Sequence, residues 1–164
     1  MKIGRVTISD RAAAGIYADR SGPEIERILR EQLGAAAGFI AVVVPDEVEE
    51  ISAALRRLAD EERCDLVVTT GSTGITPRDV TPEAIRAVLE KELPGFGELM
   101  RMASYPKVKT AILSRATAGT RGATLIINLP GKPAAVGECL TLLVSAIVEA
   151  VEHLHGRDPH HHST

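Results

Sequence analysis

The sequence predicts an α/β fold, a three-layer sandwich in which helices cover both faces of a mostly parallel central sheet. Short apolar runs rich in β-branched residues alternate along the chain with amphipathic segments of helical period. Glycine and proline separate many of these segments, and no internal repeat interrupts their order. With 164 residues, 45% of them hydrophobic, the chain can fill one core. We therefore expect a single domain over residues 1–155 and a flexible polar tail over residues 156–164.

The first part of the chain predicts a strand, a helix and a second strand. The first strand covers residues 2–8. The stretch from Ser21 to Glu24 has the form of a capping box, in which Ser21 is the N-cap and Glu24 reaches back to it. The helix extends to about residue 33, because apolar residues recur at helical spacing: Ile25, Ile28, Leu29 and Leu33. Residues 39–44 are continuously apolar, which is typical of a strand covered on both faces.

The middle of the chain repeats this alternation. Asp46 can cap a helix whose apolar stripe contains Ile51, Leu55 and Leu58. Residues 65–70 predict the next strand, and a glycine-containing loop follows it. A further helix then begins at Thr81 and continues to about residue 91, with Pro82 in the first turn, where its missing N–H costs nothing.

The last part of the chain predicts two helices and two strands. A shorter helical stretch follows Pro94 and Gly95. Residues 110–113 and 123–128 predict two strands, with a loop over residues 116–122 between them. The last helix begins near residue 133 and ends near residue 154, and its spacing predicts a buried face made of Val136, Leu140, Leu143, Val144, Ile147 and Val151.

Composition argues against two classes of partner. The formal net charge is -3 and aromatic residues make up 2% of the chain, so neither the basic surface nor the stacking rings of a nucleic-acid-binding protein are expected. No apolar run approaches the roughly 20 residues that cross a bilayer, so no membrane partner is expected. Cys64 and Cys139 lie in apolar surroundings and belong to no CxxC pair, which indicates buried, reduced thiols and a cytoplasmic protein.

The histidines restrict the possible chemistry. All five lie at the carboxyl end, from His153 onward, and three of them form the run His160 to His162. A Ser-His-Asp triad, a Cys-His pair or a histidine-bound zinc would require that tail to fold back onto the body. Catalysis is therefore expected to use carboxylates, hydroxyls, Lys, Arg and main-chain amides, which suit phosphates and Mg²⁺.

Polar or glycine-containing segments follow the predicted strands. Ligands of open α/β sheets bind beyond the carboxyl ends of the strands, so these segments converge on one candidate site. The segment from Thr69 to Gly74 is the strongest signal, because glycines can turn main-chain amides toward an oxyanion and hydroxyls add donors. It lacks the endings of a Walker A loop and of a dinucleotide loop. A plain glycine turn explains it about as well when it is considered alone.

Two acidic residues have competing interpretations. Asp46 alone is better explained as a helix cap, whereas Asp79 precedes the helix that Thr81 caps and has less structural reason to be there. If the strands are ordered as expected, both carboxylates reach the same edge of the sheet and can hold Mg²⁺ against phosphates. Arg78, Arg115 and Lys132 lie beside these loops and could neutralise phosphates, although a surface ion pair is the commoner fate of a single arginine. Arg11 and Arg20 flank the loop after the first strand and could close over a ligand, but solvated side chains explain them as well.

Six motifs in this order resemble the MogA/MoaB family of molybdenum-cofactor biosynthesis proteins, to which the G domain of gephyrin is related. The resemblance extends from the first strand to the last helix. The motifs are Ile8-Ser-Asp-Arg11, Thr69-Thr-Gly-Ser-Thr-Gly74, Arg78-Asp-Val-Thr-Pro-Glu83, Pro94-Gly-Phe-Gly-Glu98, Leu113-Ser-Arg115 and Asn128-Leu-Pro-Gly131.

The resemblance implies a homotrimer that binds molybdopterin. It also implies that the MogA branch uses Mg-ATP to adenylate molybdopterin, whereas a MoaB-like protein would bind the pterin without catalysis, and a trimeric scaffold with a vestigial pocket is a third possibility. Other enzymes of the molybdenum-cofactor pathway are the implied partners. Asp46 and Asp79 would be the catalytic pair that holds Mg²⁺. The substrate-binding residues would be Ser9, Asp10, Thr70, Gly71, Ser72, Thr73, Gly74, Arg78, Ser114, Arg115, Pro130, Gly131 and Lys132.

One residue departs from the family pattern. Ser72 stands where the family usually has the second glycine of Gly-Gly-Thr-Gly. A residue with a Cβ atom tolerates positive φ poorly. Either this position is not left-handed or the loop is strained.

Overall fold

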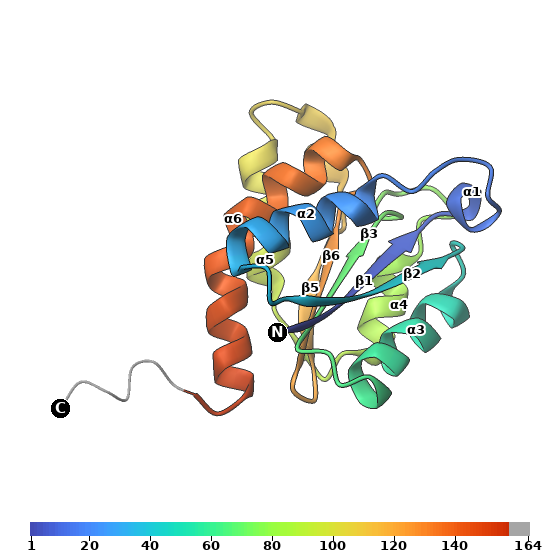
Figure 1. The fold of residues 1–164 in the computed structure, drawn as a ribbon. Coiled ribbons are helices and arrows are strands. Elements are labelled where there is room, and N and C mark those ends of the chain that lie inside the picture. Colours follow the sequence, from blue (N-terminus) through green and yellow to red (C-terminus); the bar gives the residue numbers. More distant parts are fainter. Residues whose placement is uncertain (158–164) are drawn as a thin grey trace.

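The computed structural model describes residues 1–157 and has one six-stranded sheet at its centre, with strand order β2-β1-β3-β6-β5-β4 (Figure 1). Four strands, β1 (Lys2–Ile8), β2 (Gly38–Val44), β3 (Leu66–Thr70) and β6 (Thr124–Leu129), pair in parallel. The short strands β5 (Ala118–Arg121) and β4 (Lys91–Glu92) pair antiparallel at one edge. The prediction of a mostly parallel sheet is therefore confirmed. Most of the expected tail over residues 156–164, including His160 to His162, lies outside the described residues.

The register of the parallel strands aligns their carboxyl ends. Ile8 of β1 lies opposite Val44 of β2, Thr7 lies opposite Thr70 of β3, and Thr70 lies opposite Leu129 of β6. Segments that follow four different strands therefore begin at the same edge of the sheet. This is the edge at which open α/β sheets bind ligands.

Helices cover both faces of the sheet, as predicted. On one face, α2 (Ser21–Leu33), α5 (Pro94–Ser104) and α6 (Pro133–Leu154) pack against Ile3, Val68 and Ile127. On the other face, α3 (Val48–Arg56), the π-helical turn Arg57–Glu61 and α4 (Thr81–Val88) pack against Val6, Val67 and Ile126. Alternate residues of the central strands thus point into two separate cores.

Strand β2 differs from its prediction. It was expected to be covered on both faces, but it is an edge strand that pairs with β1 alone, and Val44 is its one fully buried residue. Its apolar run reflects a parallel strand with β-branched side chains rather than complete burial. The amino-acid composition predicts that these residues form a strand, but it does not predict the position of the strand in the sheet, which depends on pairing with residues far away in sequence.

The prediction for residues 110–122 is wrong in two respects. Residues 110–113 were expected to form a strand, but they belong to a 3₁₀ turn, Lys109–Leu113, in which no residue is buried. Residues 116–122 were expected to be a loop, yet they contain β5, which forms a hairpin with β6. Gly122, with a φ of 54°, and Ala123 make the two-residue connection, which requires a left-handed residue.

The ends of two helices, α2 and α4, also differ from prediction. Arg20, not Ser21, is the N-cap residue of α2, and the Gly22 N–H donates instead to the carboxylate of Asp19 (3.0 Å). The expected capping box is therefore wrong. Helix α4 begins at Thr81, but its N-cap residue is Val80, so the prediction that Thr81 caps it is wrong. The helix ends at Val88, because the chain then turns into β4.

Helix α6 is more apolar than expected for a chain in which no continuous apolar run approaches the length of a membrane span. It has 22 residues, and an 18-residue window within it has a mean hydropathy of 1.9, so length and composition alone would allow it to cross a membrane. Leu140, Leu143 and Ile147 instead pack into the core beside α2. A core helix of a folded domain satisfies the same criteria, so this feature is weak evidence for a membrane span.

The two thiols and the two described histidines lie as expected. Cys64 and Cys139 are buried and unpaired, and burial raises the pKa of both thiols. His155 contacts the Asp65 carboxylate (2.8 Å) at the opposite edge of the sheet, just before β3 begins. The catalytic candidates must therefore be sought among oxygen- and nitrogen-bearing side chains other than these histidines.

The second core predicts the outcome of one matched pair of substitutions. Ile51 of α3 is fully buried, whereas Ile16, in the loop before α2, is 69% exposed. We expect Ile51→Ala to lower the free energy of unfolding by about 3 kcal/mol, because it removes buried methyl groups and leaves a cavity. Ile16→Ala should change it by less than about 0.5 kcal/mol. Urea denaturation of both variants measures the difference, and equal losses would contradict the assignment of this core.

Candidate functional site

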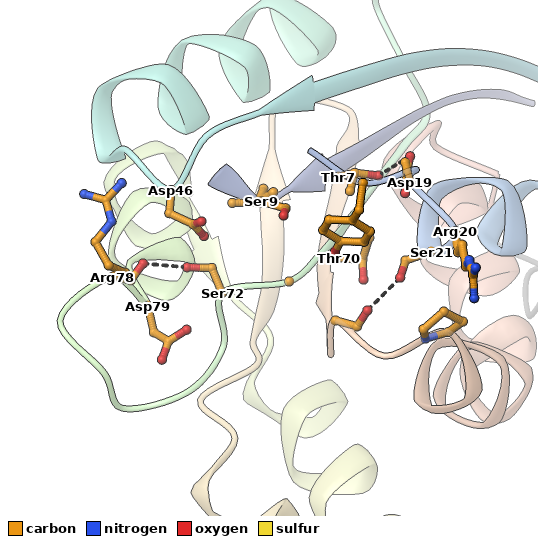
Figure 2. A pocket seen from close by; sticks show the side chains of 15 residues that line it. Thr7, Ser9, Asp19, Arg20, Ser21, Asp46, Thr70, Ser72, Arg78 and Asp79 are labelled. Carbon is orange, nitrogen blue, oxygen red and sulfur yellow. Dashed lines mark hydrogen bonds between the residues drawn. The ribbon is translucent and has the colours of Figure 1, made fainter. Parts of the chain in front are cut away.

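A cavity of about 670 Å³ opens at the carboxyl ends of β1, β3 and β6 (Figure 2). The loops that follow β1, β2, β3 and β6 all contribute to its wall. Eight predicted site residues line it: Ser9, Asp46, Thr70, Gly71, Ser72, Arg78, Asp79 and Gly131. The structure therefore brings together residues as far apart in the sequence as Ser9 and Gly131, and it does so through the parallel register of the strands.

The loop after β3 turns away from the sheet through two left-handed residues. Gly71 has a φ of +104°, and a Cβ atom there would overlap the main-chain carbonyl of Ile8. Its N–H donates to the carbonyl of Leu129 (3.1 Å), so this glycine is pressed between β1 and β6. Ser72 follows with a φ of 58°. Of the two alternatives for Ser72, the left-handed one is therefore realised.

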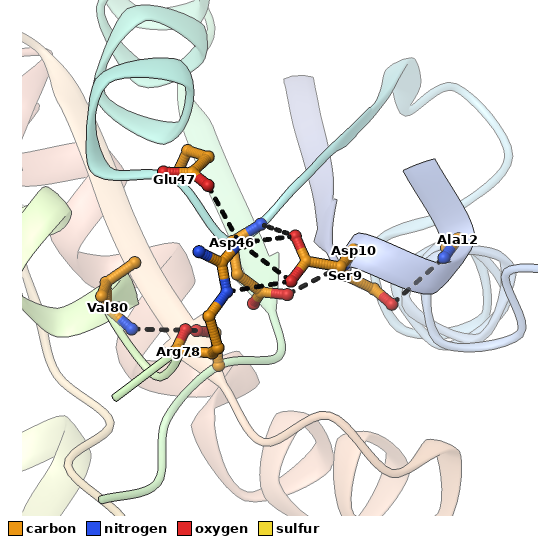
Figure 3. Close-up of polar contacts among 8 residues, drawn as sticks. Ser9, Asp10, Ala12, Asp46, Glu47, Arg78 and Val80 are labelled. Carbon is orange, nitrogen blue, oxygen red and sulfur yellow. Dashed lines mark hydrogen bonds and ion pairs between the residues drawn. The ribbon is translucent and has the colours of Figure 1, made fainter. Parts of the chain in front are cut away.

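Asp46 and Asp10 bind each other's main chain (Figure 3). The Asp10 N–H donates to Asp46 Oδ2 (2.8 Å), and the Asp46 N–H donates to Asp10 Oδ1 (2.9 Å). Helix α3 begins at Val48 with Glu47 at the N-cap, so Asp46 is not the helix cap that was one of its two interpretations. The reciprocal pair holds the end of β2 to the start of the short helix α1 (Asp10–Ala13), which Ser9 caps through its side chain.

Arg78 joins the loop after β3 to this pair. Its guanidinium donates to both carboxylate oxygens of Asp10 (2.9 Å from Nη2 to each) and to Glu47 (3.0 Å). The hydrogen bond from the Asp46 amide, and after it the Arg78 guanidinium, lower the pKa of Asp10 below its ordinary value of 3.8. Asp10 is therefore charged at neutral pH and acts here as an anchor within the loops, outside the cavity wall.

Asp79 is held by its own loop. The Thr76 N–H and hydroxyl both donate to Asp79 Oδ2 (2.8 and 2.6 Å), and the Arg115 guanidinium donates to the Asp79 carbonyl (2.7 Å). Gly74 packs against the same carboxylate so closely that a Cβ atom would lie 2.8 Å from Oδ2. Asp79 and Asp46 both line the cavity and lie at the same end of it (Figure 2).

These two carboxylates fit a magnesium ion by their chemistry. Each uses Oδ2 for a hydrogen bond, whereas no hydrogen bond within residues 1–157 involves Oδ1 of either one. Mg²⁺ is commonly bound by one or two carboxylates together with substrate phosphates and water. The described residues contain no cluster of three or more metal-binding side chains, so an all-protein cage is not the type of site found here.

The opposite end of the cavity contains residues that sequence reasoning missed. Asp19 accepts hydrogen bonds from Arg5 Nη1 (2.9 Å) and Thr7 (2.8 Å), and its other oxygen accepts the Gly22 amide. The Ser21 hydroxyl donates to the Gly131 carbonyl (2.6 Å). Cavity-lining residues not predicted as site residues are Thr7, Ile8, Tyr17, Asp19, Ser21 and Pro133, and Arg20, which was left open, also lines it. A signal existed in Asp19, three residues before Gly22, because that spacing is typical of a cap.

The remaining predicted residues surround the cavity without lining it. Arg115 donates to the Gly74 carbonyl (2.8 Å) and pairs with Glu83, and its own N–H donates to the Thr73 carbonyl (2.8 Å). The Pro130 carbonyl accepts the Thr70 hydroxyl (2.6 Å). Ser114, Pro130 and Lys132 line a second, more apolar hollow beside α5 and α6. Arg115 therefore shapes the loop and, with Ser114, lines a further small hollow, so the predicted substrate-binding residues do not all face one cavity.

Fold and site together define a class: an α/β domain with a cavity at the carboxyl ends of its parallel strands, whose lining includes carboxylates and an arginine from the strand-end loops. The family model described as "Probable molybdopterin binding domain" matches residues 4–150. The chain belongs to this family, and the resemblance to MogA/MoaB proteins is confirmed.

Relatives and solved structures agree with the family assignment. The chain is 52% identical over 150 residues to a molybdopterin adenylyltransferase of Helicobacter pylori, a match that covers 92% of this chain and 85% of the relative. It is 44% identical over 153 residues to that of Escherichia coli, with 93% and 78% covered. Among solved structures, the MoaB molybdopterin biosynthesis enzyme of Thermus thermophilus has a TM-score of 0.86 at 40% identity, with 96% and 98% covered.

Substitutions at two glycines can distinguish the cost of a steric overlap from the cost of backbone strain. Gly71 has positive φ and a main-chain carbonyl in the place of a Cβ atom, whereas Gly34 has a φ of +95° with open space there. We expect Gly34→Ala to lower the free energy of unfolding by about 2 kcal/mol from strain alone, because a φ of 95° with a ψ of 163° is a conformation that essentially only glycine adopts. Gly71→Ala should cost at least about 3 kcal/mol, because the loop must also move away from Ile8. Thermal unfolding of both variants tests this, and equal losses would show that the close approach is unimportant.

The lowered pKa of Asp10 predicts a pH dependence. A carboxylate whose pKa is lower in the folded protein adds stability above its unfolded pKa, and that stability is lost as the pH falls through the folded value. Asp10→Asn should therefore be less stable than the unaltered protein at pH 7. The difference should shrink as the pH falls below about 3.8, the ordinary value. Urea denaturation from pH 7 to pH 2.5 measures it, and a difference independent of pH would contradict the role of the charge.

Proposed function

We propose that this chain is a molybdopterin adenylyltransferase, which transfers AMP from Mg-ATP to the terminal phosphate of molybdopterin and releases pyrophosphate. The observation that carries the proposal is a cavity lined by the Gly71–Ser72 turn, Asp46 and Asp79 in a chain 44–52% identical to proteins of that name. The reaction is a nucleotidyl transfer. It needs positioning and charge neutralisation more than a side-chain nucleophile.

The transfer balances without an acid or base from histidine. An oxygen of the terminal phosphate of molybdopterin attacks the α-phosphorus of ATP, and the bond from that phosphorus to the bridging oxygen breaks. Pyrophosphate leaves with the bonding electron pair. A bound Mg²⁺ would neutralise charge on the phosphates, held by Asp46 and Asp79. The Ser72 main-chain amide and the Arg78 guanidinium would bind and orient the phosphates, whereas the Gly71 N–H is already bound to the Leu129 carbonyl.

The second hollow supports a division of the predicted residues. Ser114, Pro130 and Lys132 line it together with the apolar side chains of Met100 and Val108. Gly131 lines both hollows, so a ligand could extend from one into the other past this residue. We assign these residues to substrate binding and the Asp46–Asp79 end to phosphate chemistry.

The assembly and the setting belong to the same proposal. We infer a homotrimer, other molybdenum-cofactor enzymes as partners and a cytoplasmic location. Exposed apolar side chains on α5 and the 3₁₀ turn, among them Met102 and Ile112, support an association between copies. Buried, unpaired thiols support a reducing compartment. Sedimentation that shows a stable monomer at micromolar concentration would contradict the trimer.

The activity is tested directly by an assay with purified protein, molybdopterin, ATP and Mg²⁺. Formation of adenylated molybdopterin and pyrophosphate is the expected result. Pterin binding without product would favour the MoaB-like alternative, a binding protein without this activity, which is relevant because a MoaB structure is among the similar folds. Absence of both would contradict the whole assignment.

Asp79→Asn should abolish turnover while the protein stays folded and still binds the pterin. We expect kcat to fall by at least roughly 100-fold, because the substitution removes the charge that would hold the metal. Asp60→Asn is the matched control, since Asp60 pairs with Arg121 away from the cavity (2.7 Å) and should leave kcat unchanged. Normal adenylation by Asp79→Asn would refute the catalytic assignment of Asp79.

A further inference from the structure

Ser72 has an unfavourable main-chain conformation at the edge of the candidate site. Within residues 1–157, Arg63 and Ser72 are the two non-glycine residues with positive φ, at 56° and 58°. A Cβ atom makes this region costly, and glycine would adopt it freely. Strain of this kind persists where surrounding contacts fix the conformation, so the contacts of the Ser72 side chain require an explanation.

The Ser72 hydroxyl joins the two peptide groups that flank Asp79. It donates to the Arg78 carbonyl (3.0 Å), which belongs to the peptide group before Asp79 (Figure 2). It accepts from the Val80 N–H (3.0 Å), which belongs to the peptide group after Asp79. A single side-chain oxygen therefore fixes the main chain on both sides of this residue. Neither glycine nor alanine could make these two bonds.

Other contacts complete the restraint of Asp79. Its N–H donates to the Thr76 carbonyl (3.0 Å), and its carbonyl accepts from Arg115 (2.7 Å). Thr76 also binds one carboxylate oxygen, as described above. Ser72 supplies the connection from this loop back to the end of β3, where the Ser72 carbonyl also accepts the Thr81 N–H (3.3 Å). Without the hydroxyl, the segment from residue 73 to residue 80 would keep this main-chain bond but lose both bonds to the peptide groups that flank Asp79.

We propose that Ser72 is a positioning residue: its hydroxyl fixes the main chain around Asp79 and thereby the direction of the carboxylate that would hold the metal. This inference rests on the proposed adenylyl transfer. It also changes the role of Ser72, which the sequence assigned to substrate binding. Ser72 acts through Asp79, and its left-handed conformation is retained because that conformation brings the hydroxyl between the two peptide groups.

Two substitutions separate the hydroxyl from the backbone cost. Ser72→Gly removes the hydroxyl and relieves the left-handed conformation, whereas Ser72→Ala removes the hydroxyl and keeps the cost. Arg63→Gly is the control, because it relieves the same kind of conformation in the turn before β3, away from the cavity. If Ser72 served stability alone, Ser72→Gly would behave at least as well as the unaltered protein.

The first readout is metal binding, which does not require turnover. Mn²⁺ replaces Mg²⁺ in an electron paramagnetic resonance titration of the protein with α,β-methylene-ATP, a nucleotide that cannot transfer AMP. We expect both Ser72 variants to bind Mn²⁺ roughly tenfold more weakly, as is typical when a group that orients a metal ligand is removed. Arg63→Gly should bind it normally. In thermal unfolding, Ser72→Ala should melt roughly 3 °C or more below Ser72→Gly.

The second readout is the adenylation assay. Both Ser72 variants should lose kcat by about the same factor as their Mn²⁺ affinity, while KM for molybdopterin stays within about twofold. Mn²⁺ affinity of Ser72→Gly equal to that of the unaltered protein would overturn the inference, as would absence of Mn²⁺ binding by the unaltered protein. Absence of turnover in the unaltered protein would instead overturn the proposed function, and the Mn²⁺ comparison would still decide the role of Ser72.

Discussion

The site depends on one close approach, in which the main chain at Gly71 passes against the Ile8 carbonyl while its N–H binds the Leu129 carbonyl (3.1 Å). These contacts connect β3 to both of its neighbours at the place where all three strands end. Because no side chain fits there, the loop after β3 leaves the sheet in a left-handed direction and passes over the strand ends. Asp79 and Arg78 lie on that loop, so their distance from Asp46 and Asp10 is set by the turn at Gly71.

A body without histidine from residue 1 to residue 152 is sufficient for the proposed chemistry, because the charges involved are those of phosphates. Carboxylates hold hard cations, and guanidinium groups and main-chain amides neutralise oxyanions. The ion pairs of the site serve a second purpose. Arg78 binds the carboxylates of Asp10 in α1 and of Glu47 at the N-cap of α3, and Arg115 binds Glu83 of α4 and the Asp79 carbonyl. The loop that carries Asp79 is therefore attached to three helices from several directions.

Sequence reasoning predicted the features that follow from local patterns and from the rules of parallel sheets. The four parallel strands, the convergence of Asp46 and Asp79 and the departure at Ser72 all belong to this group. It failed where a non-local partner decides the outcome. Residues 110–113 have strand composition but find no partner in the sheet, whereas β5, with its small and polar residues, pairs with β6 through a two-residue turn. The local spacing of Ser21 and Glu24 predicts a helix cap. The Ser21 hydroxyl instead binds the carbonyl of Gly131, a residue far away in sequence, and such a contact has no local signature.

The two ends of the cavity differ in how many carboxylate oxygens are already hydrogen-bonded, and this difference supports different proposed roles for the two ends. Asp19 binds Arg5, Thr7 and the Gly22 amide through both oxygens, and its side chain is only 14% exposed. An acid whose oxygens are both hydrogen-bonded supports the wall, and replacing its partners by a metal would require breaking a largely buried ion pair. Asp46 and Asp79 instead each use one oxygen to fix their direction and leave the other without a hydrogen bond among the described residues. A carboxylate that is oriented yet still able to accept a ligand suits metal-assisted phosphate chemistry. This hydrogen bonding therefore supports the proposal that the Asp46–Asp79 end of the cavity binds the metal and the phosphates.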